Sequence, residues 1–255
     1  MSEPIQKASA SQASAAMHGQ AENTSRSADA PELSVVVIAY NEEACIDSVV
    51  SELREKLDVA GVRHQLVLVD DGSRDATLSR MRTLAAEGPR VVVVPLCPNR
   101  GIGGALRAGF DAATARYVTW VPGDGQIAPE AVLKLYMQRL RAPMLTTVYR
   151  TRADAWYRHV ISQSLNRLIE LRTGRRAKSG GNYLFERALW QAHAPRSDDS
   201  MMLSTAFRHN LKYAEVPIVE IEIDARARVA GHSKVLNPRT IFRTVAALLA
   251  LRVRR

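Results

Sequence analysis

The sequence predicts an α/β fold in which a mostly parallel sheet carries helices on both faces. Short apolar runs rich in Val and Ile alternate with longer stretches whose apolar residues recur at helical spacing, and this alternation repeats four times. Polar, glycine-containing turns follow the apolar runs, as they do where parallel strands end beside a ligand. The chain has 255 residues, 46% of them apolar, which is enough to bury a sizeable core.

The elements of the four repeats follow in order along the chain. The first run, LSVVVIA, is mostly β-branched and reads as a strand buried on both faces. A later helix has Ser73 or Asp75 as a candidate N-cap, and another opens with Pro129 near its first position. The strands are expected at 33–39, 64–70, 90–96 and 116–122, and the helices at 41–60, 73–87, 103–115 and 129–140.

The alternation weakens after about residue 150. An amphipathic helix is expected over 156–174, where Gly174 ends it, and a second helix over 200–210. Between and after them, 179–186 reads as a strand and 212–224 as an alternating, edge-type strand that contains Pro217. These elements are expected to cover the rim of the sheet.

Three segments are predicted along the chain. Residues 1–31 are rich in Ala, Ser and Gln without an apolar signal region, and are expected to form a disordered arm. Residues 32–236 form the main domain, and 237–255 a basic amphipathic helix. That helix either packs on the core or lies on a membrane with its arginines toward lipid phosphates. Because no apolar run reaches the about 18 residues of a membrane span, the expectation is a cytoplasmic protein that is either soluble or peripheral at the inner face of a membrane.

The charge balance indicates an anionic partner. The formal net charge is +9 and the pI is near 9.9, which fits nucleic acid, phosphorylated small molecules or an acidic membrane. Aromatic residues make up only 5% of the chain and form no stacking platform among basic residues, so nucleic acid is not expected. Cys45 and Cys97 are interpreted as reduced, buried thiols without a redox or zinc role.

Polar residues follow every strand of the predicted sheet. The four strands are followed in turn by AYNEE, DDGSRD, CPNRGIGG and PGDGQ. The carboxyl ends of parallel strands meet at one rim, so these residues are expected to form one ligand site. The glycine-rich turn suggests a dinucleotide site, but it follows the third strand rather than the first, which counts against NAD.

Three carboxylates at this rim have alternative interpretations. Asp70 and Asp71 either make a tight turn with Asx hydrogen bonds or bind the base or ribose of a nucleotide. Asp124 stands between Gly123 and Gly125, which would let the backbone approach a ligand closely. With the Gln126 oxygen it suits a hard cation such as Mg²⁺ or Mn²⁺. The alternative is that Asp124 caps the helix that begins at Pro129.

Six motifs in this order resemble family 2 glycosyltransferases of the GT-A fold. They are VVVIAYNEE, LVLVDDGSRDAT, NRGIGGALRAGF, GDGQIAPE, AEVPI and RVAGHSK, and they span about residues 33 to 236. Within the family, the chain looks most like the branch of dolichyl-phosphate mannosyltransferases and polyprenyl-phosphate glycosyltransferases. The resemblance implies an inverting, metal-dependent transfer of a sugar from a nucleotide-diphospho-sugar to a polyprenyl phosphate such as dolichyl or undecaprenyl phosphate, with Mg²⁺ or Mn²⁺ as cofactor.

The same resemblance implies roles for individual residues. Asp124 matches the last Asp of the family's DxD metal motif and Gln126 the glutamine two positions later, so both are implied metal ligands. The residues implied to be catalytic are Asp124, Arg150, Arg158 and Lys234, of which the two arginines face phosphate groups. Those implied to bind the nucleotide-sugar are Tyr40, Glu42, Asp70, Asp71, Gly101, Asp124, Gln126, Arg228, Ser233 and Lys234.

The chain departs from the family pattern at three places. Pro122 replaces the first Asp of DxD, Met201 stands about where many relatives carry an acidic residue, and Arg176 or Lys178 replaces a further Asp. Two other functions remain open beside the leading one. The acceptor is either a polyprenyl phosphate or a soluble saccharide or secondary metabolite, and a basic module that binds membranes or nucleic acid is the alternative to an enzyme.

Overall fold

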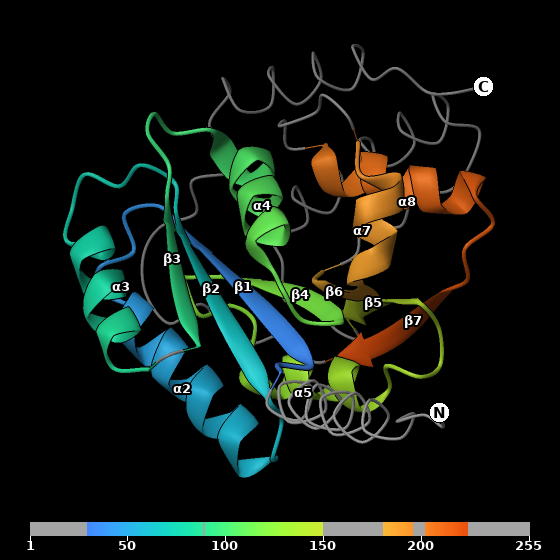
Figure 1. Ribbon diagram of the computed structural model, residues 1–255, viewed down its shortest axis with the longest axis horizontal. Coiled ribbons are helices and arrows are strands. Elements are labelled where there is room, and N and C mark those ends of the chain that lie inside the picture. The colour runs from blue at the N-terminus through green and yellow to red at the C-terminus, as the bar shows by residue number, and fades with distance from the viewer. Residues whose placement is uncertain (1–29, 89, 150–180, 196–201, 224–255) are drawn as a thin grey trace, which may run out of the picture.

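The computed structural model describes residues 30–88, 90–149, 181–195 and 202–223. These residues form one seven-stranded sheet with the order β3-β2-β1-β4-β6-β5-β7 (Figure 1). Most neighbouring strands are parallel, and only β6 runs antiparallel, to both β4 and β5. The strands are β1 (Leu33–Ala39), β2 (His64–Asp70), β3 (Val91–Pro95), β4 (Tyr117–Pro122), β5 (Met144–Tyr149), β6 (Tyr183–Glu186) and β7 (Ile218–Ile223).

Helices cover both faces of the sheet, as the sequence predicts (Figure 1). One core lies under α2 (Ile46–Val59), α3 (Thr77–Ala86) and α5 (Pro129–Met137). The opposite core lies under α4 (Gly101–Ala112), α7 (Arg187–His193) and α8 (Leu203–Tyr213). Alternate residues of β1 enter the two cores, with Val35 on the α2 side and Val36 on the α4 side, so the whole strand must be apolar.

Close packing holds α4 against the middle of the sheet. A Cβ atom at Gly109 would lie 2.2 Å from Cγ1 of Val36 and 3.1 Å from Cγ2 of Val69, so only glycine permits this approach. The next residue, Phe110, is buried and makes edge-to-face contacts with Phe185 and Trp190, at centroid distances of 5.1 and 5.0 Å. The helix that follows β3 is thereby fixed to β6 and α7, which come much later in the chain.

The strands in the second half of the chain are arranged differently from the prediction. β6 and β7 extend the sheet instead of covering its rim, because β6 inserts between β4 and β5. The periodicity of the apolar residues did not predict β5 or α7. β7 does lie at the sheet edge as predicted, but it begins at Ile218, so Pro217 precedes the strand.

Two local predictions were wrong, and the predicted burial of Cys45 is confirmed. Neither Ser73 nor Asp75 is the N-cap of α3, since that position is Ala76 and makes no side-chain cap hydrogen bond. Cys97 is not a buried strand residue, because β3 ends at Pro95 and the thiol is exposed. Cys45 is buried, although α2 begins one residue after it.

Several predicted segments lie outside the described residues. These are nearly all of the predicted arm at 1–31, the helix at 156–174 and the basic helix at 237–255. Among the residues that the structure does describe, no helix is long and apolar enough to cross a membrane.

Candidate functional site

The carboxyl ends of β1, β2 and β4 meet at one rim of the sheet. In the strand register, Ala39 lies opposite Asp70 and Ile38 opposite Pro122. The backbone pairing continues past the strand ends, since the amide of Asp71 donates to the carbonyl of Ala39 (2.9 Å) and that of Gly123 to the carbonyl of Ile38 (2.8 Å). The predicted convergence of the AYNEE, DDGSRD and PGDGQ turns is therefore confirmed.

Asp70 and Asp71 are both buried, at 1% and 5% exposure, but they have different partners. The Asp70 carboxylate accepts from the amide of Ser73 at 3.2 Å, which is the kind of Asx hydrogen bond predicted for a tight turn at this position. The Asp71 carboxylate instead reaches across to the loop before α4, where it accepts from the amide of Arg100 at 2.7 Å. Asn99 donates its side-chain amide to the carbonyl of Asp71 at 2.6 Å.

The Asp71 contact also bears on the dinucleotide alternative. Arg100 is the N-cap residue of α4, and Gly101 begins that helix with φ of 72°. In a dinucleotide fold the first amides of such a helix face a diphosphate. Here the Asp71 carboxylate holds that position, which agrees with the sequence argument against NAD.

Burial raises the pKa of the Asp71 carboxyl, although hydrogen bonds from the Arg100 and Gly101 amides act in the opposite direction. A raised pKa in the folded state means that the folded protein holds this proton more tightly than the unfolded chain does. Ionisation therefore destabilises the fold, and this loss develops as the pH rises above the usual range of an Asp carboxyl.

We expect Asp71→Asn to raise the melting temperature at about pH 7, because asparagine keeps an acceptor oxygen but cannot ionise. The advantage should shrink toward about pH 3, where the wild-type carboxyl is protonated as well. Thermal unfolding of both proteins across this range measures the difference. A variant that is less stable than the wild type at every pH would contradict this account.

Asp124 is buried, with 7% exposure, in the turn after β4. Its Oδ1 accepts from the amide of Gln126 at 3.1 Å. The helix-cap alternative is wrong, because the N-cap of α5 is Ala128 and no side chain makes a cap hydrogen bond there. Gly125 has φ of 71°, a left-handed conformation that favours glycine at this turn.

Gly123 has a packing role that the sequence analysis did not foresee. A Cβ atom there would lie 2.9 Å from Cβ of Ala39 and 3.3 Å from the carbonyl oxygen of Ile38. Glycine therefore lets the end of β4 pack tightly against the end of β1. This contact places the Asp124 turn beside the AYNEE turn.

The donors at Asp124 fit a hard divalent cation with few protein ligands. Within the described parts of the chain, no group of three or more His, Cys, Asp or Glu residues is placed to hold a metal. The set consists of the buried Asp124 carboxylate and the side-chain oxygen of the exposed Gln126. Both are oxygen donors of the kind Mg²⁺ and Mn²⁺ prefer, and ligand phosphates and water would complete the shell.

The structure describes some of the predicted site residues but not all. Tyr40 and Glu42 lie half-buried in the turn after β1, which begins beside the bond between Asp71 and Ala39, and Gly101 begins α4. Predicted residues that lie outside the described part of the chain are Arg150, Arg158, Arg228, Ser233 and Lys234. The site geometry therefore rests on the turns after β1, β2 and β4 and on the start of α4.

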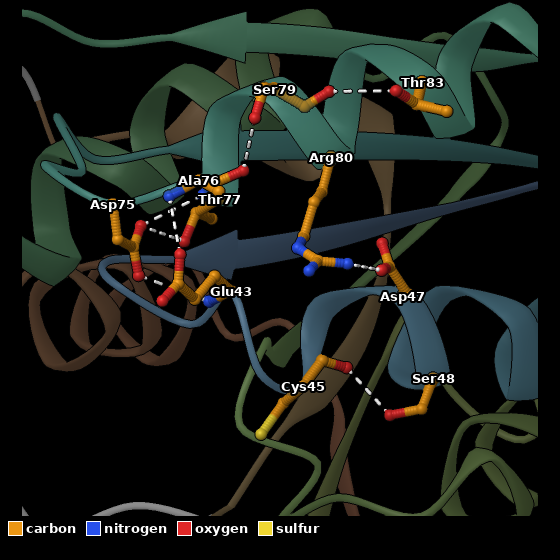
Figure 2. Close-up of polar contacts among 10 residues, drawn as sticks. All are labelled: Glu43, Cys45, Asp47, Ser48, Asp75, Ala76, Thr77, Ser79, Arg80 and Thr83. Atoms are coloured by element: carbon orange, nitrogen blue, oxygen red, sulfur yellow. Dashed lines mark hydrogen bonds and ion pairs between the residues drawn. The ribbon is translucent and has the colours of Figure 1, made fainter.

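Sequence reasoning missed the polar residues that join the turns after β1 and β2. Asp75 accepts from the amide of Glu43, Glu43 accepts from that of Ala76, and Thr77 accepts from that of Glu42, so all three side chains join the two turns; Figure 2 shows the bonds of Glu43 with Asp75 and Ala76. A signal was present, because Ser, Thr, Asn and Asp in turns tend to bond nearby backbone amides. The sequence could not show that the amides belong to another turn, more than thirty residues away.

The mostly parallel sheet with its acidic rim has the GT-A fold, the α/β architecture of the solved structures that it resembles. The particular family follows from the sequence. The chain belongs to glycosyl transferase family 2, whose family model matches residues 34–189.

Curated relatives include two bacterial proteins named undecaprenyl-phosphate 4-deoxy-4-formamido-L-arabinose transferase. The one from Aeromonas hydrophila is 33% identical over 144 residues, which cover 56% of this chain and 44% of the relative. The one from Edwardsiella ictaluri is 29% identical over 213 residues, covering 80% of this chain and 65% of the relative. The chain thus spans about half to two thirds of the length of these relatives.

Solved structures with the same fold include glucosyl-3-phosphoglycerate synthase from Mycobacterium tuberculosis. Its complex with phosphoglyceric acid superposes with a TM-score of 0.63 at 23% identity, covering 86% of this chain and 79% of that chain. A second structure of that enzyme contains Mn²⁺, UDP-glucose and phosphoglyceric acid, and has a TM-score of 0.62. At this identity the likeness establishes the fold.

Proposed function

We propose that this protein is an inverting glycosyltransferase that moves a sugar from a nucleotide-diphospho-sugar to a polyprenyl phosphate. The observation that carries the proposal is the buried Asp124, held at the end of β4 beside the acidic turns after β1 and β2. Membership of family 2 supports the sugar donor. The names of the curated relatives support an undecaprenyl-phosphate acceptor.

The turns after β1 and β2 would hold the nucleotide. Tyr40 and Glu42 come from one turn, Asp70 and Asp71 from the other, and Gly101 from the start of α4. The buried carboxylates would accept hydrogen bonds from the base or the ribose, which are rich in N–H and O–H donors. Burial makes such bonds worth more than they would be in water.

Asp124 and Gln126 would hold Mg²⁺ or Mn²⁺ against the diphosphate. When bound, the cation neutralises the negative charge that grows on the departing nucleoside diphosphate. Arg150, Arg158, Arg228, Ser233 and Lys234 are proposed to add hydrogen bonds and positive charge around the phosphates of donor and acceptor. A phosphate acceptor is already anionic, so the chain needs no strong general base, and a single in-line attack inverts the anomeric carbon.

The proposed catalytic domain is 32–236, preceded by an arm at 1–31. The basic segment 237–255 is proposed to hold the protein at the inner face of a membrane, where its arginines would meet lipid phosphates. This arrangement would make it a peripheral cytoplasmic enzyme and bring the site to a lipid acceptor.

Calorimetric titration with UDP, GDP and their sugar conjugates, with and without Mn²⁺, tests the donor half of the proposal. We expect one nucleotide to bind, and to bind more tightly with the metal. The bound sugar conjugate is then incubated with detergent-solubilised polyprenyl phosphate, and a lipid-linked monosaccharide is the expected product. Turnover only with a soluble saccharide would favour the other acceptor class, while no nucleotide binding at all would support a basic binding module instead.

A further inference from the structure

The turns after β1 and β2 are joined by hydrogen bonds in both directions. These two turns, residues 40–45 and 71–76, are called the turn pair below. The amide of Asn41 donates to Oγ of Ser73 at 2.9 Å, and the amide of Arg74 donates back to Oδ1 of Asn41 at 2.8 Å. Asn41 also has φ of 53°, a left-handed conformation that needs support from its neighbours.

A second exchange of the same kind follows along both turns. The amide of Glu43 donates to Oδ2 of Asp75 at 3.3 Å, and the amide of Ala76 donates back to Oε2 of Glu43 at 2.8 Å (Figure 2). Each turn thus satisfies backbone amides of the other. A shift of one turn relative to the other would break several of these bonds together.

Glu42 lies between Asn41 and Glu43 on the first turn, and its partner Thr77 is completely buried. Its Oγ1 accepts from the amide of Glu42 at 2.9 Å and donates to Oδ1 of Asp75 at 2.6 Å. The amide of Thr77 also donates to Oδ1 of Asp75, at 3.0 Å. Because Thr77 is the first residue of α3, its hydroxyl connects the turn that carries Glu42 to a helix packed on the sheet.

The hydrogen bonds within the turn pair have no part in the proposed chemistry, yet they hold residues that do. Tyr40 and Glu42 flank Asn41 on the first turn, Asp70 ends β2, and Asp71 begins the second turn. The bond from Asp71 to Ala39 joins the same two turns next to the sheet. Binding groups that are fixed before the ligand arrives lose less entropy on binding.

We propose that Thr77, Ser73 and Asp75 are positioning residues. They hold the turn that carries Tyr40 and Glu42 in the conformation that binds the nucleotide. This inference rests on the proposed function for the identity of the ligand. The LVLVDDGSRDAT segment then has two roles in nucleotide binding. Asp70 and Asp71 contact the ligand, and the residues after them set the geometry of the neighbouring turn.

Thr77→Val tests this role, because valine keeps the shape of threonine but leaves the Glu42 amide without its acceptor. We expect the Kd for the preferred nucleotide to rise about tenfold, the usual cost of one buried hydrogen bond left unmade. Thr77→Ser should restore binding to within about twofold, since it keeps the hydroxyl. Thr83→Val is the matched control, because exposed Thr83 lies on the same helix but donates only to the carbonyl of Ser79 (Figure 2).

Amide hydrogen exchange of the ligand-free protein gives a readout that does not depend on the ligand. The Glu42 amide should exchange faster in Thr77→Val, whereas the amides of β1 and β2 should not change. Ser73→Ala is a milder second variant that should speed exchange at Asn41, with Ser79→Ala on α3 as its control.

Equal nucleotide affinity for Thr77→Val and Thr83→Val would overturn the inference. So would unchanged exchange at Glu42 and Asn41 in the two turn variants. If the wild-type protein binds no nucleotide, the proposed function fails separately, and the exchange measurements still decide whether Thr77 and Ser73 fix the turn. Uniformly faster exchange through β1 and β2 would also count against a positioning role, because it indicates general destabilisation.

Discussion

Replacing Asp124 with alanine is expected to weaken metal-dependent nucleotide binding by on the order of 100-fold, and to reduce sugar transfer at least as much. Asp124 is the only carboxylate proposed to hold the cation, and Gln126 has no charge with which to compensate. The carboxylate accepts a hydrogen bond within its own turn and caps no helix, and thermal unfolding of the variant checks that the protein stays folded. Calorimetry with Mn²⁺ and the nucleotide measures the loss.

Asp47→Ala is a suitable control for the Asp124 variant. Asp47 is a carboxylate on α2 that pairs with Arg80 of α3 at the surface (Figure 2). The Asp47→Ala variant should keep the affinity for the nucleotide within about twofold of the wild type. A second control is metal removal, since chelation should reduce wild-type binding to the level of Asp124→Ala. If Asp124→Ala binds the nucleotide as tightly as the wild type in the presence of Mn²⁺, the metal site proposed at the end of β4 is wrong.

Phe110→Ala is expected to cause the largest loss of stability, about 3 to 5 kcal/mol of unfolding free energy. The Phe110 ring is buried among Tyr183, Phe185 and Trp190, which belong to elements that meet only in the folded state. Alanine would leave a cavity where α4, α7 and β6 meet. Urea unfolding measured by circular dichroism gives the free energy directly.

Ile102→Ala on the same helix is the control, because Ile102 is 38% exposed. Its cost should stay below about 1 kcal/mol, as is usual for residues near the surface. Losses of equal size in the two variants would mean that the aromatic cluster contributes no more to stability than the exposed end of α4 does.

The first four strand and helix pairs could be predicted from the sequence because their signals are local. LSVVVIA is apolar at every position, and a strand buried on both faces requires that pattern. The position of the site followed from the same order, since turns after parallel strands meet at one rim. Asp71 and Asp124 were therefore identified before any contact was known, and both prove to be buried there.

The elements that the sequence missed have weak local signals. α7 is only seven residues long, RALWQAH, which is too short for a helical period to stand out. β5 reads MLTTVY, and two threonines make its apolar run short. The insertion of β6 between β4 and β5 depends on contacts between residues far apart in sequence, which no local pattern records.

The sequence by itself determined the fold class, the order of the elements as far as α5, and the residue types at the rim. Only the tertiary structure decided the partners of those residues. Asp71 bonds Arg100 across 29 positions and Thr77 bonds Glu42 across 35, and the alternatives of turn, cap and ligand contact could not be separated without those distances. The physical reason is that hydrophobic periodicity is set within a few residues, whereas a buried polar group takes whichever partner the packed sheet brings within reach.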